Sequence, residues 1–209
     1  MTQEEWLSSS DPDALLQWLA RTTRPTSERK IRLFMCACYR RVEYVLRVPQ
    51  TREILHLAER FAEGQADQET VARVLRNMLL SGESSLHWAL CAAPEEVATY
   101  AAHDADRMQG WEIPTAQEKK AQVHLLRDVL GNPFHRREAV SSARLTWNGG
   151  TVRHLAQTIY ENRRFDRMPI LADALEEAGC ADAAILEHCR GPGPHVRGCW
   201  VVDLVLCKE

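Results

Sequence analysis

The chain has 209 residues, of which 45% are hydrophobic and 26% charged, a composition typical of a folded globular protein. Its formal net charge is −3, from 26 Lys and Arg against 29 Asp and Glu. This balance argues against a general nucleic-acid binder, because such proteins usually carry a strong basic excess. No apolar run approaches the roughly 18 residues that a membrane-spanning helix needs, and the acidic, polar first residues are unlike a secretion signal. We therefore expect one domain, or two small ones, located in the cytoplasm.

Cysteine is abundant in this chain, with seven residues, and the number is odd. In the absence of a secretion signal, these residues are expected to be reduced thiols. Most of them are interpreted as small core residues, because free cysteine is readily buried.

Helical signals dominate the first 131 residues. Asp11 followed by Pro12 is typical of a helix start, and Trp6 and Trp18 are expected to pack near each other. Apolar residues then recur every three or four positions in segments that we predict to be helices, with Thr51, Asp67 and Thr115 as caps and Gly131 as a stop. These segments are 27–46, 51–64, 67–80, 84–91, 94–102 and 115–131.

The second part of the chain begins with an irregular segment, 132–150, which we interpret as a structured loop. Helices are predicted over 151–164, 169–179 and 181–189, separated by glycines and prolines. The last segment, 196–206, alternates between two sets of residues as a strand does. A strand needs partners that the rest of the chain does not offer, so a buried terminal helix is favoured.

The predicted fold is all-α, a bundle of about nine to eleven mostly antiparallel helices within a single domain, 1–209. A solenoid of helical hairpins is the alternative, because helix pairs recur loosely every 30–40 residues. A subdivision into 1–131 and 151–209, joined by the irregular segment 132–150, is also possible.

The last thirty residues are the densest in residues that can bind a metal. Cys180, His188, Cys189, His195 and Cys199 all carry nitrogen or sulfur donors that suit zinc. Because His188 and Cys189 are neighbours in a predicted helix, they point about 100° apart and cannot easily share one ion. The candidate zinc ligands are therefore Cys189, His195 and Cys199. The alternative, which the cysteine pattern favours, is that these cysteines pack in the core and that no cofactor is bound.

The same region also suggests an anion site. Gly191 and Gly193 permit close backbone approach, and Arg190, His195 and Arg197 surround the start of the last element. Asp203 lies within the apolar run WVVDLVL, so it needs a buried partner. Arg190 and Arg197 are the nearest candidates, and an internal ion pair is the alternative to binding of a phosphate or carboxylate by these four residues.

Other possible sites have weaker support. The basic residues of the segment 27–47 are interpreted as a solvated face paired with acidic neighbours, which makes nucleic acid an unlikely partner. Cys36 and Cys38 lie two positions apart within one helix and face different ways, so Cys38 is interpreted as core. His103-Asp104 invites comparison with metal-dependent phosphohydrolases, with Asp128 or Asp203 as a further ligand, but the surrounding residues lack the glycines of that family.

Long motifs at both ends of the chain resemble a family of planctomycete bacterial proteins of uncharacterised function. The motifs are EEWLSSSDPDALLQWL, SERKIRLFMCACYRRV, LLRDVLGNPF and the region from IYENRRFDRMP to HCRGPGPHVRGCWVVDL. The resemblance implies a bacterial, intracellular setting and no particular fold, activity or site residue. The family often has adjacent cysteines in the second motif, whereas Tyr39 follows Cys38 here, which weakens a metal role at that position.

No pattern in the sequence indicates a catalytic site, so an enzyme is the less favoured interpretation. The leading hypothesis is a helical interaction or regulatory module whose partner is another protein. The alternatives are a protein or enzyme that binds a small anion through the C-terminal Arg/His loop, and a zinc-stabilised structural domain.

Overall fold

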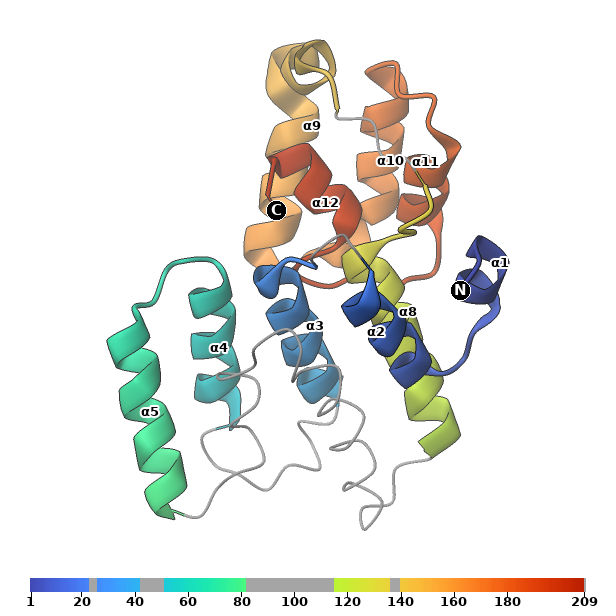
Figure 1. The fold of residues 1–209 in the computed structure, drawn as a ribbon. Coiled ribbons are helices and arrows are strands. Elements are labelled where there is room, and N and C mark those ends of the chain that lie inside the picture. The colour runs from blue at the N-terminus through green and yellow to red at the C-terminus, as the bar shows by residue number, and fades with distance from the viewer. Residues whose placement is uncertain (23–25, 42–50, 82–114, 136–139, 209) are drawn as a thin grey trace. The chain divides into compact units, whose positions relative to one another are not determined.

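The computed structural model describes residues 1–22, 26–41, 51–81, 115–135 and 140–208 (Figure 1). Within these ranges the chain forms ten α-helices, one short 3-10 helix and no strand, which confirms the all-α prediction. None of these helices is both long enough and apolar enough to span a membrane. The helices predicted over 84–91 and 94–102, and the pair His103-Asp104, lie outside the described residues. The chain divides into two compact units, Met1–Leu126 and Arg127–Glu209, and the boundary falls within one helix, α8.

The first unit is built from amphipathic helices whose starts follow the expected capping chemistry. Asp11 accepts a hydrogen bond from the backbone N–H of Asp13, with Pro12 as the first helical residue. The rings of Trp6 and Trp18 lie 5.8 Å apart, as predicted, and Trp6 is fully buried. The helices are α1 (Gln3–Ser8), α2 (Pro12–Arg21), α3 (Glu28–Arg41), α4 (Thr51–Ala62), α5 (Gln68–Ser81) and the larger part of α8 (Thr115–Leu130).

The basic residues of α3 are more buried than the sequence suggested. Lys30 and Arg32 are buried, and the Arg32 guanidinium lies 4.6 Å from the centre of the Phe61 ring. Arg40 donates two hydrogen bonds to the buried carboxylate of Glu59, at 2.7 and 3.1 Å. The expectation of a solvated face was therefore wrong for Lys30 and Arg32, whereas Arg40 pairs with an acidic neighbour as expected. The guanidinium groups of Arg32 and Arg40 thus meet a ring and a carboxylate of α4, the helix that α3 contacts.

Two further arginines and two cysteines of α3 also have defined surroundings. Arg29 pairs with Glu63, and Arg41 pairs with Glu118 of α8. Cys36 is fully buried and Cys38 is half-buried, and burial still holds the pKa of the Cys38 thiol well above its ordinary value. The interpretation of Cys38 as a core residue is therefore confirmed only in part.

The second unit is held together by a continuous apolar core. Figure 1 shows α9, α10, α11 and α12 gathered into one group, in which α10 contacts both α9 and α11, and α12 contacts α9. Fully buried residues come from each of these helices, among them Ile159, Leu171, Cys189 and Val201. The elements are α9 (Ser142–Asn162), η2 (Phe165–Arg167), α10 (Met168–Glu177), α11 (Ala183–Arg190) and α12 (Trp200–Leu206).

Helix α9 begins earlier than predicted. Its first turn follows Ser141, whose side chain accepts a hydrogen bond from the backbone N–H of Arg144. The helical path is then broken at Trp147–Gly150, where Asn148 and the two glycines have φ of 48°, 69° and 85°. Asparagine and glycine tolerate this left-handed region best. The irregular segment predicted over 132–150 is therefore wrong for the turn that starts at Ser142 and right for the residues around the break.

The last segment is a helix, as favoured from the sequence. Trp200, Val201, Val202 and Val205 are all buried, so α12 is apolar around most of its circumference. A helix that is buried on most sides has no polar face, so its apolar residues do not show the usual helical period. This is why the sequence of the segment could also be interpreted as a strand. The short α12 places Cys199, the residue immediately before it, inside the second unit.

Candidate metal centre

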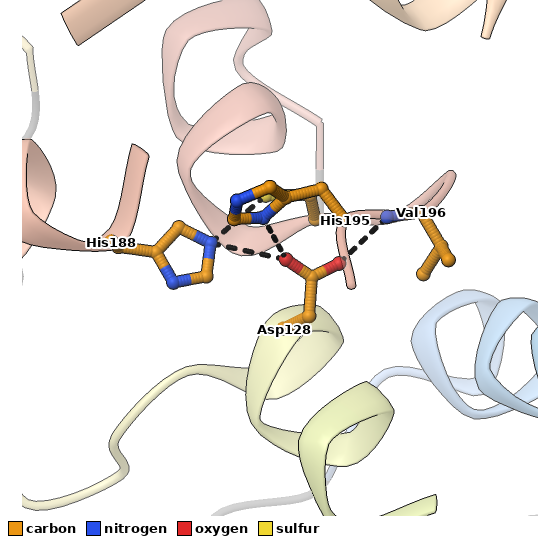
Figure 2. A network of polar contacts seen from close by, with 5 residues as sticks. Asp128, His188, His195 and Val196 are labelled. Carbon is orange, nitrogen blue, oxygen red and sulfur yellow. Dashed lines mark hydrogen bonds and ion pairs between the residues drawn. The ribbon is translucent and has the colours of Figure 1, made fainter. Parts of the chain in front are cut away.

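Asp128 is a buried carboxylate at the C-terminal end of α8, within the second unit, and its side chain is 2% exposed. One oxygen, Oδ1, lies 2.7 Å from Nδ1 of His195 and 3.1 Å from Nε2 of His188 (Figure 2). The other oxygen, Oδ2, accepts a hydrogen bond of 2.9 Å from the backbone N–H of Val196. Burial acts to raise the pKa of Asp128, but hydrogen bonds and charge interactions with the two histidines outweigh it and lower this pKa. Asp128 is therefore an ionised donor in the interior.

His188 lies on α11, and its side chain extends to Oδ1 of Asp128. The side chain of Asp182 caps this helix by accepting hydrogen bonds from the backbone N–H groups of Ala184 and Ile185. With Ile185 and Cys189 on its buried face, α11 carries His188 at the edge of the core. The Nε2 atom of His188 lies 3.2 Å from Sγ of Cys199, and its ring packs against Trp200 with 5.2 Å between ring centres.

His195 comes from the loop between α11 and α12, and its side chain is 8% exposed. Gly193 allows this placement, since its φ is +77° and a Cβ there would lie only 3.0 Å from the backbone nitrogen of His195. The other ring nitrogen, Nε2, is buried and makes no hydrogen bond with any residue of the described ranges. Protein groups in those ranges therefore do not complete the polar contacts of this ring, which is unusual for a buried imidazole.

Cys199 supplies a thiol at the start of α12 and is fully buried. Burial, reinforced by the carboxylate of Asp128, holds the pKa of this thiol well above its ordinary value, although the backbone N–H groups of Val202 and Val201 act to lower it. The thiol is therefore protonated unless a metal ion displaces the proton, as zinc does in protein sites.

Four donor atoms thus converge, one each from Asp128, His188, His195 and Cys199, and all lie within 4.8 Å of one another. A tetrahedral zinc ion with bonds of about 2.0–2.3 Å holds its donors about 3.3–3.8 Å apart. The contacts of 2.7, 3.1 and 3.2 Å along the series Nδ1–Oδ1–Nε2–Sγ are slightly shorter than this. Movements of a fraction of an ångström would therefore accommodate an ion. Nδ1 of His195 would be the nitrogen that holds an ion in this arrangement, because it faces the Asp128 oxygen that His188 also contacts.

A cysteine-protease type of mechanism does not fit these four residues. A catalytic histidine uses one ring nitrogen for the thiol and the other for the carboxylate. Here the single atom Nε2 of His188 contacts both Cys199 and Asp128. A nucleophilic cysteine also needs a lowered pKa and access to solvent, whereas Cys199 is buried with a raised pKa.

The structure brings together two of the three zinc ligands proposed from the sequence, His195 and Cys199, and leaves Cys189 outside the group. Cys189 lies on the buried face of α11, where burial raises its pKa to about 12. His188 and Cys189 point in different directions from α11, as the sequence predicts. His188, not Cys189, is the residue directed toward the other donors. Asp128 was weighed only for a phosphohydrolase site, because nothing in its local sequence links it to residues 60 positions later.

The residues of the predicted anion site are engaged by different protein groups. Arg190 is exposed and bonds Asp173 and Glu176 of α10, at 2.8 and 2.6 Å, so it is not the partner of Asp203 as the sequence suggested. Arg197 lies over the Tyr160 ring and donates to the Tyr160 carbonyl. His195 bonds Asp128, and Asp203 is buried in α12. Anion binding by these four residues stays a prediction.

Comparison with known proteins gives no family or function for this arrangement of residues. The resemblance to a planctomycete family, with the bacterial setting it implies, stays a prediction. A scan of protein-family models and searches of curated proteins and of solved structures gave no match to this chain.

Proposed function

We propose that the unit of residues 127–209 binds one transition-metal ion, and that this ion is zinc. The observation that carries the proposal is the convergence of four donor atoms within 4.8 Å, three from residues 188–199 and one from Asp128, 60 positions before His188. Asp128 lies on α8, His188 on α11, His195 in the following loop and Cys199 before α12. Zinc is bound in proteins by this combination of carboxylate, imidazole and thiolate donors.

The chemistry of the donors favours zinc over other abundant ions. Magnesium and calcium prefer sites made of oxygen atoms, and this site offers a single carboxylate with two imidazoles and a thiol. The charges also balance. A thiolate and a carboxylate together carry two negative charges, which a divalent ion neutralises, whereas an unbalanced charge in the interior is costly.

The role proposed for the ion is structural. Four protein donors fill a tetrahedral shell, and sites of this closed kind stabilise folds rather than catalyse reactions. The ion would link the end of α8, the helix α11, the loop that follows it and the start of α12. This proposal selects the zinc-stabilised domain among the alternatives drawn from the sequence. A role as an interaction module with a protein partner, and a cytoplasmic location, stay predictions.

The test is the zinc content of the purified full chain, measured by inductively coupled plasma mass spectrometry without an affinity tag. We expect one zinc per chain in the wild type and in Cys207→Ser, which replaces an exposed cysteine outside the group. Cys199→Ser should lose most of its zinc. Equal zinc in Cys199→Ser and Cys207→Ser, or none in the wild type after refolding with zinc, would refute the proposal.

A further inference from the structure

The four donors of the proposed centre differ in their exposure to solvent. The side chain of His188 is 19% exposed, against 8% for His195 and 2% for Asp128, and Cys199 is fully buried. His188 is therefore the donor that faces the outside of the unit. A small molecule that approached the centre from solvent would meet this imidazole first.

The donors also differ in how firmly the protein holds them. Asp128 is fixed by the backbone N–H of Val196, which bonds the oxygen that the histidines do not use. His195 is held in a loop whose path depends on Gly193, and Cys199 is anchored in the backbone at the start of α12. Burial and these backbone features restrain the three donors at the centre.

Among the described residues, His188 is held by side-chain contacts alone. Its contacts within the described ranges are the two that Nε2 makes with Asp128 and Cys199, together with ring packing against His195 and Trp200. Most metal-binding histidines donate their second ring nitrogen to a carboxylate, a carbonyl or water, and this bond fixes the ring. Neither Nδ1 of His188 nor Nε2 of His195 has such a bond to a described residue. The two histidines differ in exposure instead, because the side chain of His188 is 19% exposed and can rotate toward solvent, whereas that of His195 is 8% exposed.

We infer that His188 is the exchangeable ligand of this centre, and that the position it vacates accepts an external nitrogen donor of the imidazole class. This inference rests on the proposed metal function. The ion stays bound by Asp128, His195 and Cys199 while the fourth donor is replaced. An imidazole fits this position because it matches the side-chain ring in size, in donor atom and in neutral charge.

The test uses the full chain loaded with Co²⁺, whose visible spectrum reports the number and type of donors. His188→Ala should bind Co²⁺ about tenfold more weakly or worse, with a spectrum different from that of the wild type. Added imidazole should restore the wild-type spectrum in a saturable way. His195→Ala, which removes the buried imidazole instead, should not respond to the same concentrations.

The outcomes separate this inference from the proposed function. A wild-type chain that binds neither Co²⁺ nor zinc would refute the metal centre itself. If the wild type binds Co²⁺ but imidazole leaves the spectrum of His188→Ala unchanged, or restores His195→Ala equally well, His188 is not the exchangeable ligand.

The wild type provides a second measurement that needs no folded variant. Its transfer of zinc to a chelator should become faster when imidazole is present, and an unchanged rate would contradict the inference.

Discussion

Asp128 is the residue on which the polar contacts of the centre depend. It joins both histidines through Oδ1 and the loop backbone through Oδ2. Since its pKa in the folded protein is lowered, it stabilises the fold when it is ionised. This contribution is complete above the pKa of the carboxyl in the unfolded chain and is lost as the pH falls through the lower pKa of the folded state.

Replacement of this carboxylate should therefore have a pH-dependent cost. In the presence of a chelator at neutral pH, Asp128→Asn should lower the free energy of unfolding by about 3–5 kcal/mol, because it breaks a buried, hydrogen-bonded set of charges. The difference from the wild type should shrink in acid, below the ordinary pKa of about 4. Denaturant unfolding across this pH range measures it. A difference that stays constant down to strongly acid pH would show that the ionised form is not what stabilises the fold.

At the scale of elements, the loop between α11 and α12 and the helix α12 place two of the four donors. The sequence predicts α12 from its apolar character and from the lack of strand partners, and it predicts the cap at Asp11 from local rules. The turn that starts at Ser142 could not be foreseen, because its apolar residues, such as Leu145 and Trp147, pack against the core from a segment rich in turn-forming residues.

Gly193 provides a test of the loop. Gly193→Ala should reduce zinc affinity about tenfold or more, because the left-handed φ of +77° and the 3.0 Å approach to the His195 nitrogen would both have to change. Gly64→Ala, at a φ of +67° in the first unit with open space around its Cβ, is the matched control for strain alone. Competition titration with a zinc chelator gives both affinities. If both variants bind zinc as tightly as the wild type does, the loop does not set the position of His195.

Asp203 tests the packing of α12. The side chain is 2% exposed and belongs to a helix whose other residues are mostly apolar. Asp203→Ala should lower the free energy of unfolding by roughly 3–5 kcal/mol, since a buried carboxylate persists only when other groups compensate its charge. Chemical denaturation measures the change. An effect within about 0.5 kcal/mol would be typical of an exposed residue and would contradict the burial of this helix.

For the whole molecule, the fold class could be predicted and the complete donor set could not. Apolar periodicity and capping are local, so they indicate the helices one by one. The metal centre depends on which segments meet. Asp128 is 60 residues from His188, and the choice between His188 and Cys189 depends on the rotation of α11 about its axis. The sequence could therefore identify His195 and Cys199 as candidates, but not their partners.

The division into two units makes a prediction about metal removal. Chelation should increase amide hydrogen exchange in α9, α10, α11 and α12, whose shared core lies in the unit that holds the donors. Exchange in α3 and α4 should change much less, because their contacts belong to the other unit. Hydrogen exchange followed by mass spectrometry compares the two states. Equal effects in both units, or none in the second, would contradict a structural ion in residues 127–209.

The most direct test of the central claim is zinc K-edge X-ray absorption of the purified, zinc-loaded chain. The proposed centre predicts four donors, with one sulfur at about 2.3 Å and three nitrogen or oxygen atoms at about 2.0–2.2 Å. Two sulfur neighbours would instead indicate that Cys189 binds the ion together with Cys199. A shell of six light atoms without sulfur would contradict the site altogether.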